Sequence, residues 1–67
     1  MKAISGKKLS EILVKNGWQL IRVKGSHHRF KKDDINISIP IHANQDLKIG
    51  LLKSLMKQAN LTESDLI

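Results

Sequence analysis

One histidine in this sequence, His27, stands among cations in a pattern that could act on a phosphate group. It follows a Gly-Ser pair, and the short segment around it contains Arg22, Lys24, Arg29, Lys31 and Lys32. An imidazole has an ordinary pKa of about 6.5, so at cellular pH it can accept or donate a proton. Arginine and lysine bind phosphate and stabilise the charge that develops on it during a reaction. The stretch Gly25-Ser26-His27-His28 is therefore the first candidate for proton transfer at a phosphate.

Each histidine also has a reading without function. His27 could be a solvated strand residue. For His28 we favour a partly buried ring that meets a backbone carbonyl. His42 follows Pro40-Ile41 in the longest loop, where binding groups often collect, but loop histidines are commonly just solvated. A metal site that uses His27 and His42 has no acidic residue or cysteine at a recognisable ligand spacing. We predict no metal and no cofactor.

The net charge favours a polyanionic partner. Twelve Lys and Arg against six Asp and Glu give a formal charge of +6. Such a field attracts nucleic acid, mainly through release of condensed counterions. A merely solubilising surface is the alternative. The cations crowd the segment around His27, whereas Glu63 and Asp65 lie near the end of the sequence, which indicates a basic patch.

Length and composition set the remaining limits. Sixty-seven residues predict a single domain over 1–67 with a thin core. The sequence has no cysteine, which fits a reducing compartment. It shows no apolar stretch of the kind that forms a signal peptide, and no run of about 20 apolar residues that would span a bilayer. We expect a soluble, cytoplasmic protein.

The periodicity predicts an α+β fold with the order α-β-β-β-α. Ser5 is a good N-cap for a helix that Asn16-Gly17 ends. Three strands follow, over 18–23, 27–32 and 35–39, with a turn at 24–26 and Pro40 stopping the last strand. A second helix begins near Leu47 and ends at Asn60, and residues 62–65 resemble the start of a helical turn. We predict a three-stranded antiparallel sheet with both helices on one face.

The alternation of strand side chains separates the polar residues from the core. In the second strand, His28 and Phe30 point to the core side, and His27 shares the opposite face with Arg29 and Lys31. In the third strand Ile35, Ile37 and Ile39 point inward, while Asn36 and Ser38 join the polar face. In the first strand both alternating sets include apolar residues, so its faces stay unassigned.

The sequence resembles the HicA family of bacterial toxins, the RNA-cleaving halves of HicAB toxin–antitoxin modules. The resemblance starts at Gly25-Ser26-His27-His28-Arg29-Phe30 and covers nearly the whole chain. Its other landmarks are the opening helix followed by Asn16-Gly17-Trp18, the approach Arg22-Val23-Lys24, the segment Ile39-Pro40-Ile41-His42 and residues 50–61.

This resemblance implies a fold similar to double-stranded RNA-binding domains, messenger-RNA cleavage, and restraint by a HicB-type antitoxin. The functional histidine of the family follows Gly-Ser directly, which is His27 here. One departure concerns the target. Double-stranded RNA-binding domains carry a lysine cluster at the start of the last helix, but residues 46–50 contain only Lys48. We therefore expect single-stranded or locally open RNA as the substrate.

The predicted mechanism needs no metal. His27 is the general base for the ribose 2′-hydroxyl. The phosphate is held by Arg22, Lys24, Arg29 or Lys31, and Gly25 and Ser26 let the backbone approach closely. Ser26 either contacts phosphate or only shapes the turn. The general acid is unassigned, with His42, a lysine or water as choices.

Two other functions fit parts of the pattern. A non-catalytic RNA-binding adaptor on the same fold explains the charge equally well, and strand scission separates it from a nuclease. A DNA-binding module has less support, because neither helix carries a basic, polar face suited to the major groove.

Overall fold

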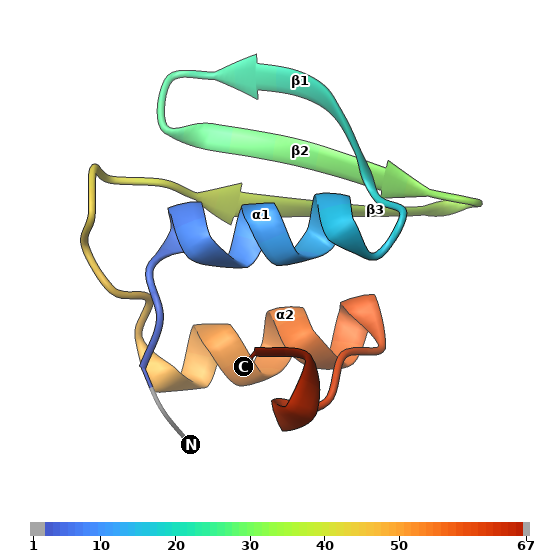
Figure 1. Ribbon diagram of the computed structural model, residues 1–67. Coiled ribbons are helices and arrows are strands. Elements are labelled where there is room, and N and C mark those ends of the chain that lie inside the picture. The colour runs from blue at the N-terminus through green and yellow to red at the C-terminus, as the bar shows by residue number, and fades with distance from the viewer. Residues whose placement is uncertain (1–2, 67) are drawn as a thin grey trace.

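The computed structural model describes residues 3–66 and has the predicted α-β-β-β-α order (Figure 1). The elements are α1 (Gly6–Lys15), β1 (Gln19–Lys24), β2 (His27–Lys32), β3 (Ile35–Pro40) and α2 (Ile49–Ala59), followed by a short 3-10 helix, η1 (Glu63–Leu66). The strands form one antiparallel sheet in the order β1-β2-β3. Within the described residues, no helix is long and apolar enough to cross a membrane.

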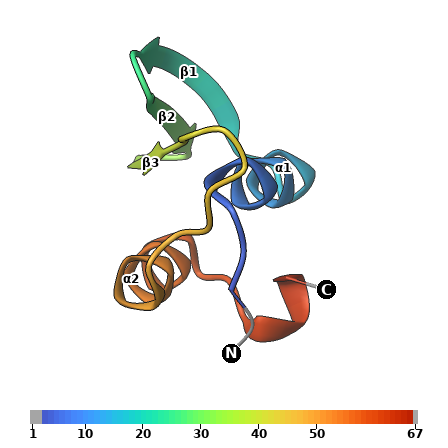
Figure 2. The same cartoon turned by 90° about the vertical axis from the view of Figure 1, so that its left-hand side faces the viewer.

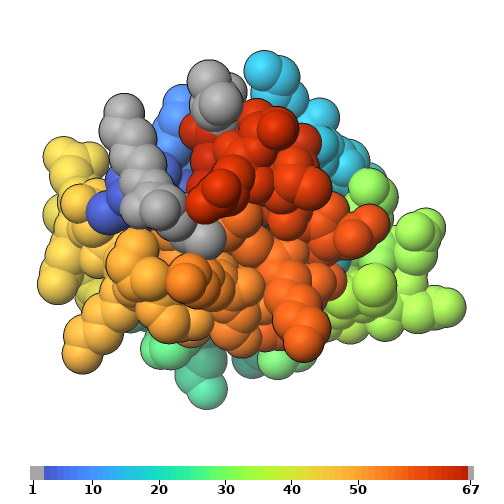
Figure 3. Space-filling model, turned by 90° about the horizontal axis from the view of Figure 1, so that it is seen from below, coloured from blue at the N-terminus to red at the C-terminus, as the bar shows by residue number. Residues whose placement is uncertain are grey.

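Both helices pack on one face of the sheet, as predicted. Phe30, Ile37 and Ile39 from that face are buried together with apolar residues of α1 and α2, namely Leu9, Ile12, Leu13, Leu52, Leu55, Met56 and Ala59. Figure 2 views the strands nearly end-on, with α1 beside the sheet and α2 beyond β3. Seen from below, α2 and η1 fill the centre of the surface, and the sheet shows only at its border (Figure 3). The other face of β1 and β2 is left open.

The helix ends confirm the local signals in the sequence. The Ser5 Oγ accepts a hydrogen bond of 3.0 Å from the Lys8 N–H at the start of α1. Asn60 ends α2 in the left-handed conformation, at φ 57°. The Asp65 carboxylate accepts hydrogen bonds from the backbone N–H and the hydroxyl of Thr62, which stabilises the terminal turn.

The second helix starts two residues later than predicted. α2 begins at Ile49, not near Leu47, and Leu47 is buried in the segment before it. The Leu47 N–H donates a hydrogen bond of 2.8 Å to the Ile4 carbonyl. This backbone hydrogen bond, and not a helical turn, holds Leu47 in the core. Ile49 and Leu51, which helical spacing would place on the apolar face of this helix, are 41% and 38% exposed.

The strands also differ in detail from the prediction. Trp18 is buried but precedes β1, which starts one residue later and includes Lys24. Pro40 is the last residue of β3 and the Cα partner of His27, so the ladder reaches one residue further than predicted. Ile35 pairs with Lys32 and is 49% exposed, because this end of the sheet extends beyond the helices.

The first turn of α1 lies so close to the end of β3 that Gly6 has no room for a side chain. A Cβ there would lie 2.5 Å from the Pro40 carbonyl oxygen. We expect Gly6→Ala to lower the free energy of unfolding by about 1–3 kcal/mol, because the helix or Pro40 must move. Urea unfolding followed by Trp18 fluorescence measures this loss.

The matched control for Gly6→Ala is Gly50→Ala in α2. A Cβ at Gly50 meets nothing within 4 Å, and alanine is favoured over glycine inside a helix by about 0.5–1 kcal/mol. The control should therefore be as stable as the wild type or slightly more so. An unchanged urea midpoint for Gly6→Ala would contradict the close approach.

Candidate nucleic-acid interface

The open face of the sheet brings His27 together with three cations. In the strand register, Lys24 and Pro40 flank His27, and Arg22 and Ser38 flank Arg29 in the next row. Side chains that are paired across antiparallel strands lie on the same face. A hollow of about 310 Å³ lies among five of these side chains, and we call it the His27 hollow: Arg22, Lys24, His27, Arg29 and Ser38.

A bulge in β1 places two of the cations. Leu20 pairs with Phe30 on the core side, whereas Arg22 pairs with Arg29 on the open side, so the register shifts between them. With strict alternation, Leu20 and Arg22 would point to the same face. The extra residue, Ile21, reverses the alternation, as bulges do next to functional sites. Arg22 and Lys24 thereby join the face of His27.

The turn beside His27 is held by backbone contacts. Gly25 has a φ of 58°, a conformation that glycine adopts without steric penalty. The Ser26 carbonyl accepts a hydrogen bond of 2.7 Å from the Ile41 N–H, which links the β1–β2 turn to the chain after β3. Gly25 and Ser26 thus fix the place where His27 enters β2.

The charge in the His27 hollow has one sign. Its lining holds two guanidinium groups, one ammonium group, one imidazole and one hydroxyl, and no carboxylate. All of these side chains are exposed to solvent. An accessible cluster of this kind attracts an anion and provides donors for its oxygens.

The other predicted site residues lie outside the His27 hollow. Lys31 is on the same face, but it lines a different hollow, described below. His42 is exposed in the loop after β3, where it lines a hollow with Pro40 and the residues before α2. His42 is thus two residues from the partner of His27. The structure therefore groups Arg22, Lys24, His27 and Arg29 and leaves Lys31 and His42 separate.

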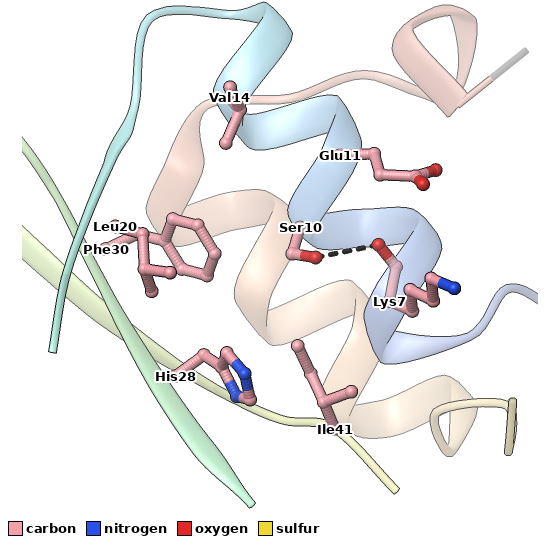
Figure 4. Close-up of a pocket in the computed structure, with 8 residues that line it drawn as sticks. All are labelled: Lys7, Ser10, Glu11, Val14, Leu20, His28, Phe30 and Ile41. Carbon is pink, nitrogen blue, oxygen red and sulfur yellow. Dashed lines mark hydrogen bonds between the residues drawn. The ribbon is translucent and has the colours of Figure 1, made fainter. Parts of the chain in front are cut away.

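His28 points to the opposite side of the sheet. Its Nδ1 lies 3.4 Å from the Ser26 carbonyl oxygen, and the ring is half-buried, as predicted from alternation. Figure 4 shows the mostly apolar hollow that it lines between α1 and the sheet, with Leu20 and Phe30 facing Val14 of the helix. This environment separates His28 from the cations around His27.

Ser38 is the site residue that sequence reasoning placed on the polar face but did not assign to the site. Its register position opposite Arg29 gives it that place. The strict alternation of Ile35 to Ile39 was the signal that could have identified it. Within residues 3–66, no three His, Asp or Glu side chains are grouped so that they could hold a metal ion.

No curated protein matches the chain. The model of the family described as the HicA toxin of bacterial toxin–antitoxin systems matches residues 6–61. This match includes all three strands, both α-helices and every residue of the His27 hollow. The chain belongs to the HicA toxin family.

Proposed function

We propose that this toxin is a metal-independent endoribonuclease that cleaves messenger RNA, with His27 acting at the ribose 2′-hydroxyl. HicA toxins are mRNA interferases and belong to type II modules, in which the antitoxin is a protein. The observation that carries the proposal is the His27 hollow, where one imidazole lies among three cations on the face that the helices leave open.

The chemistry uses the nucleophile that RNA already contains. Neutral His27 accepts the proton of the 2′-hydroxyl, and the 2′-oxygen forms a bond to the adjacent phosphorus. Arg22, Lys24 and Arg29 stabilise the added negative charge of the phosphorane. The bond from phosphorus to the 5′-oxygen then breaks, and that oxygen takes a proton. The products are a 2′,3′-cyclic phosphate and a 5′-hydroxyl.

The proton for the leaving 5′-oxygen comes from an acid that we leave open between His42, a lysine and water. His42 lies two residues after Pro40, the Cα partner of His27, and lines a different hollow. Gly25 and Ser26 shape the turn and let the RNA backbone approach.

The substrate that we propose is single-stranded or locally open RNA. Lys48 is the N-cap of α2, and the first turn of the helix adds Ile49, Gly50 and Leu51. A duplex-binding domain needs several cations here to reach phosphates across a groove. The cations lie on the open sheet face instead. A cationic surface of this kind binds the backbone of a single nucleic acid strand.

A cognate HicB-type antitoxin would cover the His27 face, since a protein over this surface blocks both RNA binding and His27. We expect acetylation of Lys24 and Lys31 to fall when the antitoxin is bound, and acetylation of Lys53 on α2 to stay unchanged. Mass spectrometry of the modified peptides measures this. An antitoxin that binds while Lys24 keeps its full reactivity would contradict this proposal.

The test of the proposed function is incubation of the purified protein with single-stranded RNA in excess EDTA. Scission under these conditions is the expected result. Binding without scission would favour the non-catalytic adaptor, and tighter binding of duplex DNA than of RNA would favour the DNA-binding alternative.

A further inference from the structure

The open sheet face has three cross-strand rows, and each contains a group that can contact phosphate. The first row is Lys24, His27 and Pro40, and the second is Arg22, Arg29 and Ser38. The third row is Gln19, Lys31 and Asn36. The middle members are alternate residues of β2, so the rows follow one another along a single strand. We call these three rows the β2 track.

The step between rows matches the repeat of a nucleic acid backbone. Residues i and i+2 of a strand are about 6.7 Å apart, which is close to the separation of successive phosphates in an extended single strand. One RNA strand that lies along β2 can therefore place consecutive phosphates at His27, Arg29 and Lys31.

The third row has its own hollow. A space of about 410 Å³ is lined by Gly17, Gln19, Lys31, Lys32 and Asp33. The Lys32 Nζ donates to the Asn16 carbonyl at 2.9 Å, which holds its positive charge beside the hollow. Gln19 and Asn36, which flank Lys31, bring amide groups and no negative charge. The third row therefore offers a phosphate the Lys31 ammonium group and two neutral amides, and the hollow beside it adds Lys32 and, at its end, the Asp33 carboxylate.

The two ends of the β2 track differ. Beyond the third row, the β2–β3 turn brings the carboxylates of Asp33 and Asp34, and Asp33 lines the end of the hollow. Like charge there repels a phosphate and marks the end of the track. Beyond the first row lies the turn of Gly25 and Ser26, which has no charged side chain. His27 thus stands at one end of the cationic rows, not at their centre.

We propose that the RNA strand lies along β2 with the scissile phosphate at the His27 row and the next two phosphates, on one side of the cut only, at the Arg29 and Lys31 rows. The guanidinium groups of Arg22 and Arg29 line the His27 hollow, so they lie between the scissile phosphate and the next one and can donate to both. This inference rests on the proposed function. It assigns Lys31 to a binding subsite two phosphates away from the reacting bond, with Gln19 and Asn36 as its neighbours. The nucleotides on one side of the cleaved bond then contribute most of the binding energy.

The experiment uses oligonucleotides with one cleavable position. The sequence is taken around a junction that the wild type cuts in a longer RNA, with one ribonucleotide at that junction and 2′-O-methyl nucleotides elsewhere. The strand is lengthened by one nucleotide at a time, on the 5′ side or on the 3′ side. We expect kcat/KM to rise at least about tenfold over two added nucleotides on one side, and less than about twofold on the other.

Lys31→Ala assigns the far subsite. This variant should lose the increase from the second added nucleotide and cleave the shortest substrate as well as the wild type. Lys53→Ala, a change of the same kind on the exposed side of α2, should behave as the wild type. Equal length dependence on both sides would overturn the inference, and so would a Lys31→Ala loss that is the same for every length.

If the protein cuts none of these RNAs, the proposed function is disproved, but the path of the RNA strand along β2 is still to be tested. Fluorescence anisotropy of the same length series then decides it. The track is supported if the affinity rises with RNA length up to three phosphates. It is also supported if Lys31→Ala lowers the slope of log affinity against log salt concentration by about one. Affinity that is independent of Lys31 at every length would overturn it.

Discussion

His27→Ala should abolish RNA cleavage and leave most of the RNA affinity intact. General base catalysis contributes about 10²- to 10⁴-fold to a rate, so a loss of this size is expected in kcat. The affinity should survive because Arg22, Lys24 and Arg29, which line the same hollow and which we propose to hold the phosphate, are unchanged. The measurement pairs single-turnover cleavage with fluorescence anisotropy on the same labelled RNA.

The matched variant for His27→Ala is Arg29→Ala, its neighbour on the same face of β2. Arg29 contributes charge, so its loss should weaken RNA binding and reduce the salt slope by about one. His27 is exposed, and its substitution should leave the urea midpoint unchanged. Wild-type cleavage by folded His27→Ala would remove His27 from the mechanism.

Phe30→Ala should unfold the protein at room temperature. Phe30 is 2% exposed and lies in the centre of the sheet between Leu20 and Ile37. Truncation of a buried phenylalanine costs about 3–5 kcal/mol, and the core of so small a domain supplies only about 3–5 kcal/mol of net stability. Circular dichroism and urea titration measure the effect.

Two further variants make the Phe30 result specific. Phe30→Leu keeps most of the apolar volume and should fold with a lower urea midpoint. Val23→Ala removes an exposed side chain from the neighbouring strand and should change the midpoint little. A cooperative urea transition for Phe30→Ala at the wild-type midpoint would show that the sheet does not depend on this contact.

The parts of the fold that could be predicted follow from local rules. The alternation of Ile35 to Ile39 placed Ile37 and Ile39 in the core, and the same rule put His27 and His28 on opposite faces. Ser5 and Asn60 mark helix ends because the signals act within a few residues of the backbone groups that they satisfy.

The features that were missed depend on distant contacts. The bulge at Ile21 is hidden in the sequence because Leu20, Ile21 and Val23 are all apolar, so no alternation shows which residue is extra. The burial of Leu47 depends on its backbone contact with Ile4, more than forty positions earlier. Periodicity alone therefore assigned Leu47 to the helix.

The candidate site was predicted in part for the same reasons. His27 and Arg29 alternate within one strand, so their common face could be predicted. Arg22 and Lys24 were chosen for their charge, but only the bulge in β1 brings them to His27. The separation of Lys31 from the His27 hollow depends on the shape of the sheet surface, which no spacing rule gives.

The most direct test of the central claim is end-group analysis of the RNA that the wild-type protein cuts in EDTA, beside a substrate with a single 2′-deoxy substitution at the cleaved nucleotide. If His27 activates the 2′-hydroxyl, the products carry a 2′,3′-cyclic phosphate and a 5′-hydroxyl, and the substituted strand stays intact at that position. Products with a 5′-phosphate, or cutting at the deoxy position, would show that water is the nucleophile and would contradict the mechanism.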